Sequence, residues 1–225
     1  MPNENNPQLA ISIIDQIYIS QGEYGSFTHY AGSSQELAID FRGWDETSPP
    51  RIERYPLYAP FDCRVTSVWS AYAQVNWVNT VWVRAANGEI FPPFTLSFTI
   101  IHDWDWPYYA PGQNATQGQL FHHTGNATGT SGTSTADHTH LQFVRGSTMP
   151  WPIPVSQQLH IYDIMDVAGV HIYHGFNYPW IADGEWVYPD PDFPDTPGGE
   201  LTRNQRYNII NSRRFKARQD MRRRR

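Results

Sequence analysis

The sequence HTHLQF at residues 138–143 places two histidines, His138 and His140, two positions apart in a run that alternates polar with apolar side chains. This alternation is typical of a β-strand with one buried face. Because side chains two positions apart on a strand point to the same side, both imidazoles are expected to face one cavity. An H-x-H pair alone is more often formed by core or surface histidines, so the rest of the chain decides its meaning.

Other segments have the same strand-like character and are separated by Gly, Pro and Asn residues that are typical of turns. With the strand at 140–145, they are residues 9–20, 37–41, 64–69, 75–84, 95–102 and 119–122. The chain has 15% aromatic residues, 18 Pro and 16 Gly, a mixture that favours short strands over long helices. The predicted fold is therefore all-β or β-rich, an antiparallel sheet folded around a groove, with an irregular aromatic and proline-rich extension.

The 225 residues are enough for one domain with a real core. Residues 1–9 are polar and are expected to be a loose N-terminus, whereas residues 10–188 form the domain with its C-terminal extension. The sequence PDPDFPDTPGG at 189–199 looks like a boundary, so residues 189–225 are expected to be a linker and a basic tail. Small residues dominate 125–137, which fits a loop over the groove.

The net charge of -6 is divided unevenly, because residues 203–225 carry +9 and the remainder carries -15. Such a tail either contacts an acidic partner or is a solvated terminus, and the acidic body gives no sign of nucleic-acid recognition. The single cysteine, Cys63, excludes an internal disulfide and a zinc site built from cysteines. Because no run approaches about 18 apolar residues and the start lacks a basic segment before an apolar one, we expect neither a membrane span nor ordinary secretion.

Two more positions have the residue types of a chemical site. His29 is followed by Asp40, which lies inside an apolar strand, and His102 ends the apolar run 96–101. A buried carboxylate needs a partner, and a metal ion is a strong one. Two histidines and one carboxylate, with a fourth position left to water, are the ligand set of a catalytic zinc site.

Several motifs occur in a specific order. They are His29 and Asp40, APFDCRV at 59–65, the strand that ends in His102, Gly112-Gln113, the Gly-rich stretch 125–132 and the closing HTHLQF. This order resembles the lysostaphin-like zinc metallopeptidases, which cut peptide bonds in bacterial peptidoglycan. The resemblance covers residues 18 to 143 and implies a zinc ion at the floor of the groove.

The resemblance also implies a role for each polar residue. It makes His29, Asp40 and His140 the zinc ligands, and it makes His138 and His102 the two catalytic histidines. Two departures from the family pattern concern packing and spacing. Ten residues separate His29 from Asp40, and Cys63 replaces a glycine of the Ala-Pro turn. A longer connection can still deliver both side chains, because loop extension costs little entropy.

Three further stretches resemble the versions of this domain that tailed bacteriophages carry on the virion tail: IYISQGE at 17–23, IHD at 101–103 and LHIYDI at 159–164. This resemblance implies a virion protein that acts on peptidoglycan at the cell wall and contacts other tail proteins through residues 203–225. Two alternatives stay open: a tail-tip protein that keeps the fold without catalysis, and a carbohydrate binder that uses the aromatic-rich region 146–200.

Other polar residues have an ordinary explanation. The neighbours His122 and His123 face opposite sides of a strand and are expected to be surface or groove histidines. The pair His171 and His174 has a spacing that can bind metal on a helix, but core or surface positions are favoured. The acidic turn with Asp103 and Asp105 beside Trp104 and Trp106 either lines a groove or is solvated on one side.

Overall fold

The structure of the protein is a computed structural model that describes residues 1–14, 16–21, 23, 28–43, 54–125, 138–165 and 171–174. The strands are β1 (Gln8–Leu9), β2 (Gln16–Gln21), β3 (Ile39–Gly43), β4 (Pro56–Tyr58), β5 (Cys63–Trp69), β6 (Gln74–Asn79), β7 (Val83–Arg84), β8 (Ile90–Phe91), β9 (Leu96–Ile101), β10 (Asn114–Ala115), β11 (Leu120–His123), β12 (Thr139–Arg145), β13 (Gln158–Leu159) and β14 (His171–His174). The helical segments are short: η1 (Ser70–Tyr72), η2 (Trp106–Tyr108), η3 (Val155–Gln157) and α1 (Ile161–Ile164).

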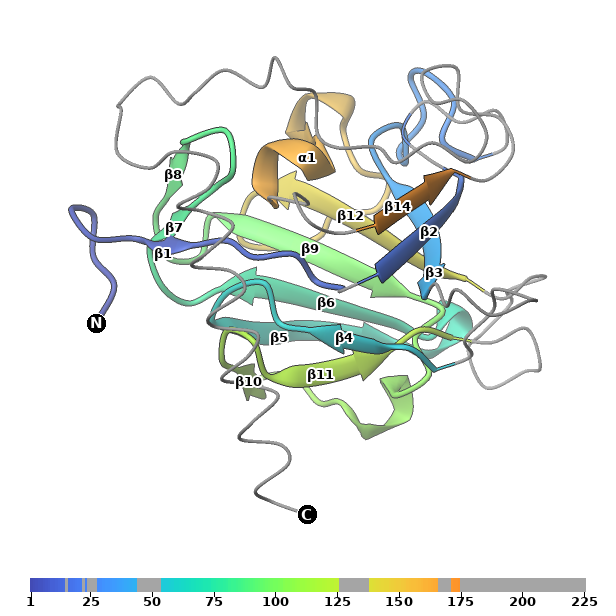
Figure 1. Cartoon of the computed structure of the whole chain (residues 1–225), viewed down its shortest axis with the longest axis horizontal. Helices are drawn as coiled ribbons and strands as arrows, with labels where there is room; N and C mark the ends of the chain where they lie inside the picture. Colours follow the sequence, from blue (N-terminus) through green and yellow to red (C-terminus); the bar gives the residue numbers. More distant parts are fainter. Residues whose placement is uncertain are drawn as a thin grey trace.

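One large sheet dominates the structure, in the strand order β10-β5-β6-β9-β12-β3-β2-β14, with β13 paired to β12 (Figure 1). Its neighbouring strands are antiparallel except for the β2–β14 pair, which is parallel. A short sheet joins β1, β7 and β8, and β4 pairs with β11. The predicted β-rich fold with an antiparallel sheet is confirmed.

The large sheet buries an aromatic core on one of its faces. Phe98 on β9 lies at its centre, with its ring centroid 5.4 Å from that of Phe143 and 6.3 Å from that of Trp77. Phe121 of the β4–β11 pair covers this face and lies 5.3 Å from Trp77. Because side chains alternate along β12, His140 and Gln142 point away from Phe143 and its core neighbours. The opposite face of the sheet is thus left for the polar residues.

Two predicted strands are shorter than expected, for physical reasons. The segment 9–20 divides into β1 and β2, because the chain bends between them, where the Ser12 hydroxyl donates to the Ile14 carbonyl at 2.8 Å. The segment 75–84 divides after Asn79, whose buried amide donates to the carbonyls of Val81 and Pro92 and turns the chain.

The N-terminal residues 1–9 do not form a wholly loose segment. The last two of them form β1, which pairs in parallel with β7. The predicted loop at 125–137, apart from Gly125, lies outside the described residues, as do the boundary at 189–199 and the basic tail at 203–225. Within the described part of the chain, no helix has the length and apolar character that a membrane span requires.

The position of Phe98 generates a stability prediction. Replacing the fully buried Phe98 with alanine is expected to lower the free energy of unfolding by about 3–5 kcal/mol, because a cavity opens among aromatic rings. Tyr108 is 77% exposed, so Tyr108→Ala is the control and should change stability by about 0.5 kcal/mol or less. Urea unfolding measures both values, and equal losses in the two variants would contradict this core assignment.

Candidate metal centre

The pairing of β3 with β12 brings a carboxylate and an imidazole together. Asp40 and His140 are directly opposite each other in this antiparallel pair. Both side chains project from the face opposite the aromatic core, and Nδ1 of His140 lies 2.9 Å from Oδ1 of Asp40. In the pairing of β2 with β3, the register shifts between Ile19 and Gln21, and Gln21 lies opposite Asp40. The sheet itself therefore fixes two members of the site.

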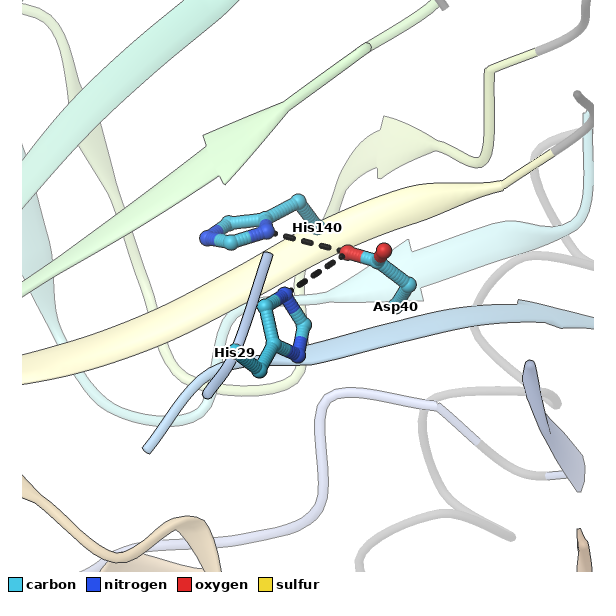
Figure 2. Close-up of side chains that lie close together, drawn as sticks. All are labelled: His29, Asp40 and His140. Carbon is cyan, nitrogen blue, oxygen red and sulfur yellow. Dashed lines mark hydrogen bonds and ion pairs between the residues drawn. The ribbon is translucent and has the colours of Figure 1, made fainter. Parts of the chain in front are cut away.

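The third member, His29, comes from the connection between β2 and β3. Its Nε2 lies 3.5 Å from the same Oδ1 of Asp40, and its ring centroid is 5.2 Å from that of His140 (Figure 2). Residues 31–37 of the connection form consecutive turns, in which Ser33 N–H donates to the Tyr30 carbonyl and Gly32 has the positive φ of +82° that such a turn requires. His29 is fully buried in this arrangement.

Two glutamine side chains hold this connection against the sheet. Gln142 donates from its amide to the Ser34 carbonyl at 3.0 Å, and Gln158 donates to the Ser33 carbonyl at 2.8 Å. The Oε1 of Gln158 accepts from the N–H of Leu37 and from Gln142, at 3.0 Å each. These contacts explain how a ten-residue spacer still delivers His29 to Asp40.

The glutamines did not emerge from sequence analysis. Gln142 had a visible signal, because it lies two positions after His140 and so shares its face of the strand. Gln158 had none, since its partner Leu37 is 121 positions away.

A second set of contacts joins Glu23, near the beginning of the same connection, to α1; we call these contacts the Glu23 clamp. The buried Glu23 carboxylate lies 2.6 Å from Nδ1 of His160 and accepts from the N–H of Ile161 at 2.8 Å. The hydrogen bond to Glu23 raises the pKa of His160 above its ordinary value, although partial burial opposes the shift. The pair thus ties Glu23, which follows β2 closely in the chain, to the start of α1.

The surroundings of Asp40 and His140 favour the protonation states in which these side chains can bind a metal ion. Burial alone raises the pKa of the Asp40 carboxyl, but hydrogen bonds and charge from His140 and His29 outweigh it and hold the pKa below its ordinary value. Burial lowers the pKa of His140, and the hydrogen bond to Asp40 only partly opposes the change. A carboxylate and a neutral imidazole are the forms that bind a metal ion.

The spacing of the donor atoms fits a metal ion. One ligand atom from each of His29, Asp40 and His140 lies within 4.8 Å of the other two. A tetrahedral zinc ion with bonds of about 2.0–2.2 Å holds its ligand atoms roughly 3.3–3.6 Å apart. The two contacts to Asp40 Oδ1, at 2.9 and 3.5 Å, lie close to this range. Two imidazoles and one carboxylate are also the donor types that zinc prefers.

Two further histidines lie beside the cluster. His138 precedes His140 by two positions, and its Nε2 is 3.8 Å from Oδ2 of Asp40 with 16% of its side chain exposed. The ring centroid of His102 is 4.8 Å from that of His138. His102 has a left-handed φ of +61°, and its N–H donates to the Tyr72 carbonyl at 3.0 Å. The structure therefore brings all five sequence candidates into one region.

The other polar residues that the sequence singled out are not part of this cluster. His122 and Asp103 are fully buried as a hydrogen-bonded pair, so the expected surface or groove position of His122 is wrong. The reason is that the acidic turn folds over β11 and supplies the carboxylate. His123 is partly exposed. The backbone of His171 and His174 forms β14 rather than a helix, and their side chains lie outside the described part.

Comparison with solved structures gives matches to known peptidases. The catalytic domain of lysostaphin from Staphylococcus simulans is 15% identical, with a TM-score of 0.39 over 64% of this chain and 87% of that domain. Whole lysostaphin is 14% identical, with a TM-score of 0.41 over 80% of this chain and 61% of that chain. The deep-sea M23 metalloprotease pseudoalterin is 15% identical, with a TM-score of 0.38 over 69% of this chain and 74% of that chain.

These neighbours are peptidases of the lysostaphin family. This is the family that the sequence resembles. No protein-family model matches the chain. At 14–15% identity to the lysostaphin-family structures, the roles of single residues depend on the geometry of the site itself.

A curated protein from a bacteriophage is more similar in sequence. Morphogenesis protein 1 of Bacillus phage B103 is 33% identical over 217 residues, which cover 91% of this chain and 52% of that protein. The chain thus spans about half the length of this relative.

The cluster generates a metal-binding prediction. The purified wild-type chain is expected to hold about one zinc ion, because three protein ligands and a water complete a catalytic site. Asp40→Asn and His140→Ala each remove a ligand and should lose the metal on dialysis. His123→Ala removes a histidine outside the cluster and should keep it. Elemental analysis measures the content, and zinc retained at the wild-type level in both ligand variants would contradict the assignment.

The Glu23 clamp generates a pH prediction. A raised pKa means that the folded state holds the His160 proton more tightly, so the contribution to stability is complete below the ordinary pKa of 6.5 and is lost as pH rises through the raised value. Glu23→Gln should therefore lower the free energy of unfolding more at about pH 5.5 than at about pH 9. In an NMR titration, the pKa of His160 should return towards 6.5 in this variant. An unchanged His160 titration would contradict the clamp.

Proposed function

We propose that the chain is a zinc-dependent endopeptidase that cleaves peptide cross-links of bacterial peptidoglycan. The observation that carries this proposal is the convergence of His29, Asp40 and His140 on one point, with His138 and His102 beside it. A structural zinc site is closed by four protein ligands, whereas three ligands leave a position for water. The arrangement therefore favours a catalytic site over a purely structural one.

The metal and the protein have separate tasks in this proposal. When bound, zinc supplies a water of lowered pKa and polarises the scissile carbonyl. His29, Asp40 and His140 hold the metal, and the sheet register keeps Asp40 and His140 in place. All three side chains are buried, and the contact of Gln142 with the Ser34 carbonyl holds the connection against the sheet beside them.

His138 and His102 perform the proton chemistry. As the tetrahedral intermediate forms, negative charge develops on the carbonyl oxygen, and a neighbouring imidazole N–H can donate a hydrogen bond to it. The leaving amine also needs a proton, which a histidine side chain can deliver. His138 is positioned for contact with substrate, because it is partly exposed and 3.8 Å from Asp40. His102 lies against it and completes the pair.

The similarity to a phage morphogenesis protein supports a location in the virion. We infer that the chain is carried on the phage tail, where the peptidase opens the cell wall during genome entry. The basic residues 203–225 carry +9 and are proposed to bind acidic surfaces of other tail proteins. Arginine suits this contact, because its planar guanidinium pairs with carboxylates in a bidentate manner.

The role of His138 generates an activity prediction. His138→Ala should keep its zinc and its fold but cleave peptidoglycan about 10²–10⁴-fold more slowly, because it loses a group that acts on the transition state. The control, His123→Ala, also removes a partly exposed histidine and should retain wild-type activity. Release of free amino groups from purified peptidoglycan measures cleavage of any cross-link. A zinc-loaded wild-type chain that releases none from several wall types would instead favour an inactive tail-tip protein.

The basic tail generates an assembly prediction. A chain that ends at Glu200 lacks the +9 segment and is expected to enter virions much less than the full chain, while its peptidase activity in solution is unchanged. Immunoblots of purified particles measure incorporation. Equal incorporation of the two chains would refute the anchoring role.

A further inference from the structure

Two aspartate–histidine pairs join the turn after β9 to strand β11. Nδ1 of His122 lies 2.7 Å from Oδ2 of Asp103, and Nδ1 of His123 lies 2.7 Å from Oδ2 of Asp105. Because His122 and His123 are adjacent on a strand, they face opposite sides. The first pair is completely buried, whereas the side chains of the second pair are 32% and 23% exposed. The protein thus contains the same contact in two environments.

The hydrogen bonds of the buried pair fix its proton positions. The indole N–H of Trp77 donates to Nε2 of His122 at 2.8 Å. Since an indole nitrogen can only donate, Nε2 carries no proton, and the ring proton lies on Nδ1 and is donated to Asp103. The other oxygen of Asp103 accepts from the N–H of Asp105 at 3.2 Å. Every polar group in the series Trp77–His122–Asp103 therefore has a partner.

This series ends beside a histidine of the proposed active site. Asp103 directly follows His102, whose φ of +61° is uncommon for a residue with a side chain. The N–H groups of His102 and Asp103 donate to the carbonyls of Tyr72 and Ala73, at 3.0 and 3.1 Å. The η1 turn therefore holds the backbone from one side, and the Asp103 side chain holds it from the other.

We propose that Trp77, His122 and Asp103 are positioning residues that keep the His102 imidazole against His138. The proposal rests on the proposed function, in which these two histidines act on the substrate. Asp103 and His122 touch no reacting atom and act through the backbone of His102. A fully paired, buried polar series suits this task, because it permits one geometry, whereas apolar packing permits several.

The matched variants are Asp103→Asn and Asp105→Asn, in the zinc-loaded full chain. The two N–H donors meet different oxygens of the Asp103 carboxylate, and asparagine replaces one of these oxygens with an NH₂ group that cannot accept. Asp103→Asn therefore loses one of the two contacts with almost no change of side-chain volume. We expect kcat on peptidoglycan to fall about 10- to 100-fold, with KM within about 2-fold and zinc content unchanged. Asp105→Asn should leave kcat within about 2-fold, because its pair is partly solvated.

An NMR measurement separates positioning from a merely structural role and does not depend on activity. In the wild-type chain with labelled histidines, nuclear Overhauser contacts are expected between the rings of His102 and His138, whose centroids are 4.8 Å apart. Asp103→Asn should weaken these contacts and leave the signals of His29 and His140 unchanged. Unchanged contacts, or a wild-type kcat, would overturn the proposal. If the wild-type chain cleaves nothing, the proposed function fails, but the NMR result still decides the positioning.

A second pair of variants covers the case in which Asp103→Asn does not fold. His122→Asn keeps an N–H donor near the position of Nδ1, whereas His122→Ala has none. The proposal predicts that the asparagine variant retains the contact between His102 and His138 and that the alanine variant loses it. Equal behaviour of the two variants would overturn it.

Discussion

The carboxylate of Asp40 is buried at the point where three parts of the chain meet. His140 on β12 and His29 in the β2–β3 connection both lie within 3.5 Å of one of its oxygens. A carboxylate removed from water is unfavourable unless donors or positive charge surround it. The register of β3 against β12 and the path of the connection both meet this requirement. A divalent metal ion held by the three side chains would satisfy the same requirement more fully.

The supporting contacts follow from the location of this carboxylate. The connection between β2 and β3 can adopt many conformations, so its order depends on contacts made after the sheet has formed. Gln142 and Gln158 bind its backbone carbonyls, and Glu23 ties its beginning to α1. On the other side of the site, the series from Trp77 to Asp103 reaches His102 from the aromatic core. The core therefore influences the site through hydrogen bonds as well as packing.

Much of this arrangement was predictable from periodicity. Alternation along residues 138–143 placed His138 and His140 on one face, and the apolar strand around Asp40 indicated a buried carboxylate. His29 was singled out because it precedes the apolar strand that contains Asp40, but its role as a ligand came only from the family resemblance, because its loop has no regular pattern. The clamps were not predictable, since Glu23 and His160 are 137 positions apart and the sequence carries no signal of such pairing. His122 was misjudged for the same reason, because its partner Asp103 comes from a turn whose path depends on tertiary contacts.

The central claim is that His29, Asp40 and His140 hold one zinc ion. Anomalous diffraction at the zinc absorption edge, on crystals of the zinc-loaded full chain, locates the metal and its ligands in one measurement. We expect a single strong peak about 2.0–2.2 Å from one atom of each of these three side chains, with no fourth protein ligand. A peak at other residues, or a fourth protein ligand that closes the site, would contradict it.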